Sequence, residues 1–262
     1  MTLYTKGYAK VNLGLWILGS TGSKHRLKTL YYALPDLYDD VSVVPGTGLI
    51  TTNSIDIPLD DTNIAAKALD FAGLDSSEYD IEIIKRIPIA AGLAGGSADA
   101  AAALVSSGVQ IKDYRELEVV GADVPFALEA TQNDGTIMAI GSGFGEVLEE
   151  VVDIPKFKID VFPQDLKISA SESYKRFDEL IAQGKLTIHD EYTVDQTIQQ
   201  ILDSLRSKDI ETLSNLLHND LENVALDLYP QLYEPLFELQ EQFPDGVVFI
   251  SGSGPTICAL SF

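Results

Sequence analysis

The sequence predicts an α+β fold with two domains. Segments typical of strands and of helices are mixed along the chain, without the regular strand–helix–strand order of a doubly wound sheet. The 262 residues are enough for a sizeable core, and a content of 45% hydrophobic and 22% charged residues is ordinary for a globular protein. A proline near the middle of the chain and a restart of the pattern predict one domain over residues 1–153 and a second over 154–262.

The first predicted elements are strands. Residues 8–18 are apolar with partial alternation, which is typical of a strand. Residues 29–46 predict two strands, because a turn at Pro35 and Asp36 separates two apolar segments.

A helix, a strand and a second helix are predicted next. Residues 60–74 predict a helix, because polar capping residues precede an apolar helical pattern and Gly73 follows it. Residues 79–89 alternate as a strand that ends at a proline. An alanine-rich helix is predicted over 97–106, with Ser97 as its N-cap.

The rest of the chain continues in mixed style. The segment 114–130 and a strand pair over 135–151 complete the first domain. In the second domain the pattern predicts a strand over 156–163, a serine-capped helix over 169–184, helices over 193–206, 209–217, 219–227 and 230–242, and a closing strand pair over 247–262.

Charge and composition exclude several classes of protein. A net charge of −22 repels nucleic acid and anionic membranes, so we expect a small-molecule substrate and neither of those partners. The single cysteine, Cys258, lies in an apolar run typical of buried packing, and no apolar run reaches membrane-spanning length. These features and the absence of a signal-peptide pattern predict a cytoplasmic protein, either a monomer or a homodimer. His25, His189 and His218 are scattered without metal-ligand spacing.

Three segments contain no Asp or Glu although the chain is strongly acidic. They are residues 1–35, 83–98 and 246–262, and the last two are rich in glycine. This distribution predicts that the three segments form one site for an anionic ligand. The alternative is that strands of a protein core simply lack acidic residues.

The most unusual segment is "PIAAGLAGGSADAAAAL" at 88–104. It fits neither the P-loop pattern nor the dinucleotide-binding fingerprint of a Rossmann fold. A strand, a Gly/Ala loop and an alanine-rich helix can present backbone N–H groups to a polyphosphate, with the Ser97 hydroxyl available to phosphate or Mg²⁺. The residues by themselves leave open a second interpretation, in which small side chains permit close helix packing.

Two charged residues stand in apolar surroundings and are candidates for a catalytic pair. Asp123 lies in the turn "GADVP" and Lys10 lies in the first predicted strand. A buried charge requires a partner, and an Asp–Lys pair can orient and deprotonate a substrate hydroxyl. Asp123 is also a candidate cap for the turn that follows it. The segment "SGSGP" at 251–255 is either a simple hairpin turn or a place where backbone amides approach a ligand.

Taken together, these motifs resemble those of the GHMP kinase superfamily of small-molecule kinases. The matching segments are "AKVNLGLWILG" at 9–19, the glycine loop at 88–104 and "ISGSGPTICAL" at 250–260. The resemblance implies a two-domain GHMP kinase fold, with an N-terminal α+β domain like a ribosomal-protein fold and a shortened, ferredoxin-like C-terminal domain. It also implies ATP and Mg²⁺ as cofactors.

Within the superfamily the chain is most similar to the 4-diphosphocytidyl-2-C-methyl-D-erythritol kinases of non-mevalonate isoprenoid biosynthesis. The segments that carry this likeness lie at 37–43, 60–69, 121–128 and 219–230. The resemblance implies phosphorylation of a hydroxyl group of that substrate. A kinase for another small alcohol, such as homoserine or mevalonate, and a non-catalytic nucleotide-binding paralogue are the alternatives.

The resemblance also implies roles for individual residues. Asp123 would be the catalytic base and Lys10 its partner, and Ser97 would reach Mg²⁺. The positions around ATP would be Asn63, Lys85, Pro88, Ala90, Ala91, Gly92, Leu93, Ala94, Gly95, Gly96, Ser97 and Asp99. The positions around the substrate would be Asn12, Lys24, His25, Ser251, Gly252 and Gly254.

The chain departs from the family pattern mainly in its substrate half. Lys24 stands where the family usually has a tyrosine that stacks on cytosine, and Ala170 stands where it commonly has a threonine. The connection before residue 121 is short, and the sequence stops at Phe262, where relatives continue. The pattern of the nucleotide half and the catalytic pair is intact.

Overall fold

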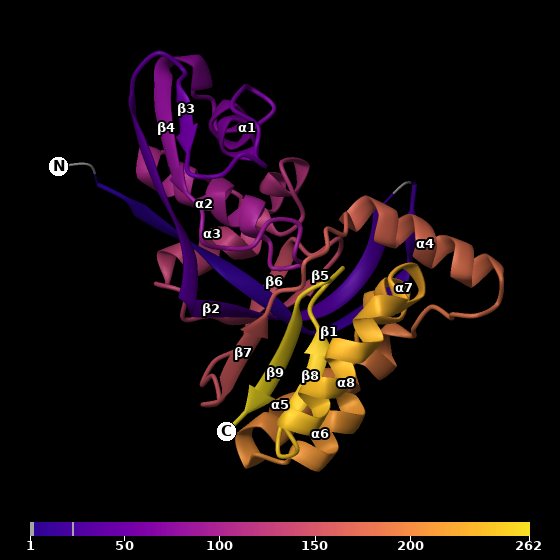
Figure 1. The fold of residues 1–262 in the computed structure, drawn as a ribbon. Helices are drawn as coiled ribbons and strands as arrows, with labels where there is room; N and C mark the ends of the chain where they lie inside the picture. The colour runs from indigo at the N-terminus through magenta and orange to yellow at the C-terminus, as the bar shows by residue number, and fades with distance from the viewer. Residues whose placement is uncertain (1–2, 23) are drawn as a thin grey trace.

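The computed structural model describes residues 3–22 and 24–262. Within these residues the strands form one six-stranded and one three-stranded sheet, and helices cover both (Figure 1). The six-stranded sheet contains β1 (Thr5–Thr21), β2 (Lys24–Pro45), β3 (Ile50–Thr52), β4 (Tyr79–Ile84), β5 (Met138–Ser142) and β6 (Val147–Glu150). The three-stranded sheet contains β7 (Lys158–Phe162), β8 (Val247–Ile250) and β9 (Ile257–Ser261). These sheets confirm the predicted α+β class.

The first sheet is built around a long antiparallel ribbon of β1 and β2. On the edge opposite β1, β2 pairs with β5 near its start and with β4 near its end, and β3 adds to β4 in parallel. In the second sheet β9 lies between β7 and β8, and both pairings are antiparallel. Figure 1 shows the β1–β2 ribbon running from the first domain across to the helices of the second.

The predicted turn at Pro35 and Asp36 is wrong. β2 is one strand of 22 residues that runs through this position. Its register against β1 jumps here: Leu34 faces Ala9, but the next paired residue, Tyr38, faces Tyr8. The extra residues form a bulge against β1, whose own backbone continues without a break. A proline suits this place, because it has no N–H to give to the sheet.

The helices of the first domain are α1 (Ile64–Phe71), α2 (Gly95–Ser107) and α3 (Val124–Gln132), with 3₁₀ turns η1 (Ser76–Glu78) and η2 (Tyr114–Val119). Asn63, one of several polar residues that the sequence offered as caps, caps α1 by accepting a hydrogen bond from the N–H of Ala65. Ser97, in contrast, is not the N-cap of α2. The helix begins two residues earlier, because Ala94 takes a left-handed conformation with φ of 57° and turns the chain into the helix there.

The second domain contains α4 (Ala170–Ala182), α5 (Glu191–Ser207), α6 (Ile210–Leu216), α7 (Asp220–Leu228), η3 (Pro230–Leu232) and α8 (Tyr233–Gln242). Ser169 caps α4 through the N–H of Glu172, which confirms the predicted serine cap. Cys258 is fully buried in β9, as expected for a packing residue. None of the helices in the described part of the chain has the length and apolar character required to span a membrane.

The two domains share one hydrophobic core. Side chains of β1 such as Leu13 and Trp16 pack in the same cluster as Ile198 and Leu202 of α5 and Phe249 of β8. A second cluster places α4 and α7 against the far end of β1. The long β1 strand therefore holds both domains in a defined relation on either side of the site described next.

Candidate active site

A cavity of about 460 Å³ lies where β1, the glycine loop and the second domain meet. Its size is within the usual range for a small-molecule site. The three acid-free segments of the sequence all contribute to its wall. The predicted site residues that line it are Lys10, Asn12, Lys85, Pro88, Ala90, Ala91, Gly92, Ala94, Gly95, Gly96, Ser97, Asp123 and Gly252.

The glycine loop passes directly against the loop between β8 and β9. Gly92 has a φ of +76°, and a Cβ atom at this position would lie 2.3 Å from the carbonyl oxygen of Ser251. The neighbouring Leu93 accepts a backbone hydrogen bond from Lys10 at 3.1 Å, which fixes the loop to β1. The segment "SGSGP" is therefore both a turn between strands and part of the cavity wall, through Gly252 and Ser253.

The start of α2 forms another part of the wall. Gly95, Gly96 and Ser97 occupy the first turn of the helix and line the cavity. The first N–H groups of a helix have no partner within it, and the helix dipole places partial positive charge there. This end of α2 is suited to an anionic group such as a phosphate.

Lys10 and Asp123 form the predicted ion pair. The Lys10 Nζ lies 3.3 Å from Asp123 Oδ2 and 2.6 Å from the Oδ1 of Asn12. Asp123 lies at the N-cap position of α3, but its side chain makes no capping hydrogen bond. Its carboxylate instead borders the cavity, with 29% of the side chain exposed, so it is within reach of a bound molecule.

Tyr31 is a site residue that the sequence reasoning missed. Its hydroxyl donates a hydrogen bond of 2.9 Å to Asp123 Oδ1. Burial and the neighbouring Asp123 carboxylate raise the pKa of Tyr31 well above its usual value, so the hydroxyl keeps its proton and remains a donor. Gly145 leaves the space for this hydroxyl, because a Cβ at that position would lie 2.5 Å from the oxygen. The signal available in the sequence was its position in an acid-free strand segment.

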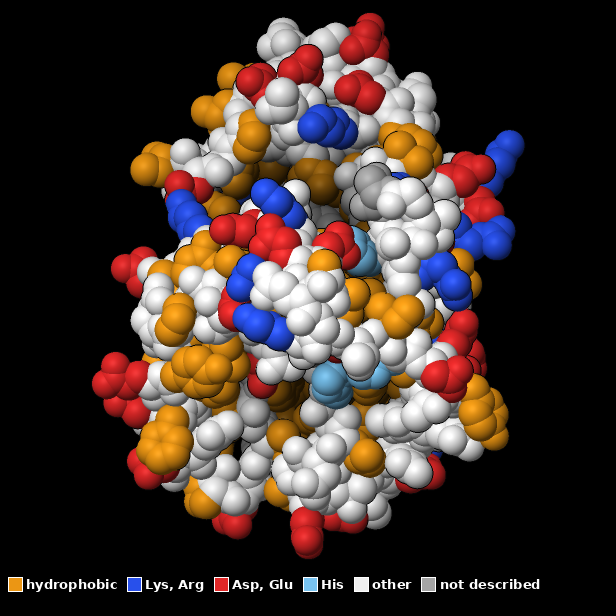
Figure 2. All heavy atoms as spheres, turned by 90° about the vertical axis from the view of Figure 1, so that its right-hand side faces the viewer, with side chains coloured by type: hydrophobic (Ala, Val, Ile, Leu, Met, Phe, Trp, Pro, Cys, Tyr) orange, Lys and Arg blue, Asp and Glu red, His pale blue; other side chains and the backbone are white. Residues whose placement is uncertain are grey.

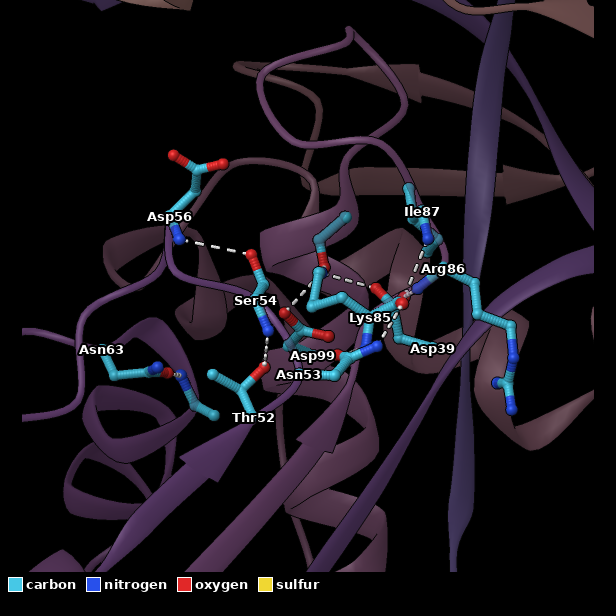
Figure 3. A network of polar contacts seen from close by, with 12 residues as sticks. Asp39, Thr52, Asn53, Ser54, Asp56, Asn63, Lys85, Arg86, Ile87 and Asp99 are labelled. Atoms are coloured by element: carbon cyan, nitrogen blue, oxygen red, sulfur yellow. Dashed lines mark hydrogen bonds and ion pairs between the residues drawn. The ribbon is translucent and has the colours of Figure 1, made fainter.

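Lys85 lies beneath the glycine loop and pairs with two buried carboxylates (Figure 3). Its Nζ is 2.5 Å from Asp39 Oδ2 and 2.7 Å from Asp99 Oδ2. Asp39 also accepts hydrogen bonds from the backbone N–H groups of Arg86 and Ile87, at 2.5 and 2.8 Å. This network joins β2, the end of β4 and α2, and it supports the loop that lines the cavity.

The two carboxylates of this network differ in their surroundings. Burial, reinforced by the charge of Asp39, raises the pKa of Asp99 to about 7, although Lys85 acts in the opposite direction. Asp99 Oδ1 is buried and has no hydrogen-bond partner among the described residues. Asp39, in contrast, accepts hydrogen bonds from two backbone N–H groups in addition to its contact with Lys85.

A second cavity of about 550 Å³ adjoins the first, and the two share Ala122, Phe144 and Tyr174 in their walls. Lys24 and His25 line this second cavity. The ring of His25 stacks on Tyr174 with 4.7 Å between centroids, and its Nε2 lies 2.8 Å from Asp178 Oδ1.

Lys24, the residue that departs from the family pattern, forms an ion pair with Glu118 at the wall of this second cavity. Its ammonium also lies 5.3 Å from the centre of the Phe144 ring. Two aromatic residues that the sequence reasoning missed, Phe144 and Tyr174, therefore lie near the position where an aromatic side chain was expected.

Several predicted site residues lie outside the walls of both cavities. Asn63 is buried in its role as the cap of α1, where it also donates a hydrogen bond to the Pro58 carbonyl. Leu93 and Asp99 are buried behind the glycine loop. Ser251 and Gly254 lie in the β8–β9 loop without lining either cavity, and Ser251 contacts the backbone of Asn12 and Gly92 instead.

Comparison with known proteins identifies relatives of this chain. The model of the GHMP kinases N terminal domain matches residues 62–128, and that of the GHMP kinases C terminal matches residues 201–261. A 4-diphosphocytidyl-2-C-methyl-D-erythritol kinase from Arthrobacter sp. (strain FB24) is 34% identical, covering 99% of this chain and 85% of the relative. A protein of the same name from Nocardioides sp. (strain ATCC BAA-499 / JS614) is 37% identical, covering 95% and 84%. A crystal structure of 4-(cytidine 5'-diphospho)-2C-methyl-D-erythritol kinase matches with a TM-score of 0.73 at 26% identity, covering 98% of this chain and 90% of that chain.

Proposed function

The chain belongs to the GHMP kinase family, and we propose that it transfers the γ-phosphoryl group of ATP to a hydroxyl group of 4-diphosphocytidyl-2-C-methyl-D-erythritol. The observation that carries this proposal is the Lys10–Asp123 pair, which borders the same cavity as the glycine loop. Relatives that cover nearly the whole chain bear the name of this kinase. We also propose that the domain boundary lies near residue 153, between β6 and β7.

The glycine loop and the start of α2 are the proposed site for the ATP phosphates. Gly95 and Gly96 have no side chains to keep a phosphate away from the backbone N–H groups. Lys10 lines the same cavity, and its ammonium opposes the negative charge of the triphosphate, while Lys85 supports the loop from behind through its pairs with Asp39 and Asp99. The donors and the charge of this wall therefore fit a triphosphate.

The same wall offers oxygen ligands for Mg²⁺. The Ser97 hydroxyl and the Asp123 carboxylate both border the cavity, and Mg²⁺ in kinases is commonly held by one or two protein oxygens together with phosphate oxygens. We propose Ser97 as the hydroxyl ligand. A bound magnesium ion would neutralise charge on the β- and γ-phosphates.

The proposed reaction is a single phosphoryl transfer. The substrate oxygen forms a bond to the γ-phosphorus, the bond from that phosphorus to the bridging oxygen of ADP breaks, and the hydroxyl proton passes to Asp123. The Tyr31 hydroxyl holds Asp123 Oδ1, which leaves Oδ2 beside Lys10 to receive the substrate hydroxyl. Lys10 also offsets charge that develops on the transferred group.

The second cavity is the proposed site for the cytidyl end of the substrate. It adjoins the first cavity and shares wall residues with it, so we propose that one extended molecule occupies both. Phe144 and Tyr174 supply aromatic surface for a base, and His25 supplies a ring nitrogen. We propose that these residues replace the stacking tyrosine, while Lys24 is held by Glu118.

The proposal is tested by measuring ADP release from Mg-ATP with and without 4-diphosphocytidyl-2-C-methyl-D-erythritol. We expect release that depends on this substrate and falls at least about a hundredfold in Asp123→Asn, because a missing general base costs 10²–10⁴-fold. ATP binding by Asp123→Asn is expected to remain close to that of the unchanged protein. Release that other small alcohols stimulate equally well, or that Asp123→Asn retains, contradicts the proposal.

A further inference from the structure

Outside the candidate active site, His189, His218 and Asp220 form a compact cluster. The Nε2 atoms of the two histidines lie 2.9 and 2.8 Å from the same oxygen, Oδ1 of Asp220. The three ligand atoms all lie within 4.8 Å of one another. The spacing of the histidines in the sequence gave no sign of this cluster, because 28 residues lie between them and the fold alone brings them together.

β1 holds all three residues in place through its backbone. The N–H of Ile17 donates a hydrogen bond of 2.6 Å to Oδ2 of Asp220, and the carbonyl of Ile17 accepts one of 3.1 Å from the N–H of His189. The N–H of Leu15 donates to the carbonyl of His218 at 2.8 Å. Asp220 is buried, and its Oδ2 is held by the N–H of Ile17, so this oxygen is fixed independently of the histidines.

The histidine rings are packed on one side and open on the other. His218 stacks on Trp16 with 6.1 Å between centroids, and the two histidine rings meet edge to face at 5.0 Å. Their side chains are 29% and 36% exposed. Figure 2 shows adjacent histidine side chains at the surface on the side that lies to the right in Figure 1. Water molecules can therefore complete a coordination sphere from outside.

From this geometry we propose that His189, His218 and Asp220 bind one divalent transition-metal ion, with zinc as the best match. Two imidazole nitrogens and one carboxylate oxygen are ligands that zinc accepts, whereas Mg²⁺ and Ca²⁺ favour oxygen ligands alone. On binding, each histidine presents an unprotonated Nε2 to the metal and carries its proton on Nδ1. The hydrogen bond from Ile17 to Oδ2 is the kind of outer contact that orients a ligating carboxylate.

The proposed ion has a structural role. It joins the loop before α5 to the start of α7 and to β1, three segments that are distant in sequence. The residue between two of its ligands, Asn219, donates hydrogen bonds of 2.8 Å to the carbonyls of Ile250 and Gly252 in the β8–β9 loop. The metal would therefore stabilise the second domain next to the wall of the active-site cavity.

The test is zinc binding by the full chain after treatment with a chelator, in the absence of nucleotide. Titration calorimetry with zinc chloride is expected to give one equivalent bound, with no comparable binding of magnesium chloride. His189→Gln and His218→Gln are each expected to weaken zinc binding at least about tenfold. His25→Gln is the matched control, because it removes the one histidine outside the cluster. The melting temperature of the unchanged protein is expected to rise by roughly 5 °C at a hundredfold excess of zinc over its Kd.

A second measurement uses the unchanged protein and does not depend on the folding of variants. With ¹⁵N-labelled histidine, zinc is expected to shift the side-chain NMR signals of two of the three histidines and to leave that of His25 in place. Absence of stoichiometric binding, binding that persists in the double variant of His189 and His218, or equal shifts at His25 would overturn the proposal.

Discussion

At the scale of single residues, Lys85 is notable because its one positive charge faces two carboxylates. Its ammonium neutralises one unit of charge between Asp39 and Asp99, both of which are buried. Two carboxylates that share one cation in a dry place cannot both ionise without cost. The raised pKa of Asp99, about 7, expresses that cost.

This balance predicts a pH-dependent effect of Asp99→Asn on stability. Between the usual pKa of an aspartate, 3.8, and about 7, folded protein retains a proton on Asp99 that unfolded protein loses. The stability contributed by this proton is present at low pH and is lost as the pH rises, by at most about 1.4 kcal/mol per pH unit. The free energy of unfolding is measured with urea for Asp99→Asn and for the unchanged protein. The stability of Asp99→Asn relative to the unchanged protein should therefore increase from pH 5 to pH 7.

The exposed Asp203 gives the control, because its side chain is 75% exposed and has no buried charge to relieve. Asp203→Asn should differ from the unchanged protein by a similar amount at every pH in this window. A constant difference for Asp99→Asn as well would show that Asp99 is ionised throughout and that our assignment of the proton is wrong.

A second prediction at this scale concerns Phe144 in the second cavity. If a cytosine base stacks there, Phe144→Ala removes about 1–3 kcal/mol of binding and raises the KM for the cytidyl substrate about 5-fold to 150-fold. The KM for ATP should change little, because the glycine loop is unaltered. Tyr192→Ala, which removes an exposed aromatic ring far along the chain in α5, should leave both values unchanged in the same steady-state assay. Equal effects on both substrates would place the base elsewhere.

At the scale of elements, the glycine loop depends on a close backbone approach. Gly92 has a positive φ, and its backbone lies so close to the neighbouring loop that an added Cβ would collide with the carbonyl oxygen of Ser251 and press on the backbone nitrogen of Gly254. The loop between β8 and β9 could not come this near to any other residue. The two loops are thus matched to each other, and together they form one wall of the cavity.

We therefore predict that Gly92→Ala lowers the melting temperature and weakens ATP binding together. The left-handed conformation costs an L-residue roughly 1–2 kcal/mol, and the collision with Ser251 adds to this. Gly184→Ala is the matched control, because Gly184 also has a positive φ, of +68°, but a Cβ there meets nothing within 4 Å. Thermal melts without ATP report the loss of stability, and the rise in melting temperature on adding ATP reports how much ATP binding is retained. Similar losses in both variants would mean that conformation alone matters and that the loop contact does not.

At the scale of the whole molecule, the shared core joins the two domains. Trp16, the single tryptophan of the chain, is buried in a cluster that contains residues of both sheets and of α5. Unfolding either domain alone would expose this cluster to water, which is unfavourable for every apolar group in it.

We predict one cooperative unfolding transition for the whole chain. Trp16 fluorescence and far-UV circular dichroism should change at the same urea concentration, because the core around Trp16 and the helices of the second domain are lost together. Mg-ATP should move both signals to higher urea concentration by the same amount. Two separate midpoints would show that the domains unfold independently and that the shared cluster contributes little.

The sequence alone determined much of this protein. Elements with clear local signals were predicted correctly, such as α1 after its polar capping segment and α4 with its Ser169 cap, because capping depends on neighbours in the chain. The glycine loop, Lys10 and Asp123 were found from residue type and order, and the resemblance that they carry agrees with the relatives of the chain.

The tertiary structure decided what depends on residues far apart in sequence. The bulge at Pro35 exists because β1 continues opposite it, and Asp99 turns away from the cavity because Lys85 and Asp39 lie behind the loop. Tyr31 reaches Asp123 across 92 residues of chain, and His189 meets His218 because β1 fixes both. The propensities of neighbouring residues cannot predict such contacts, since the contacts form only when packing of the elements brings the side chains together.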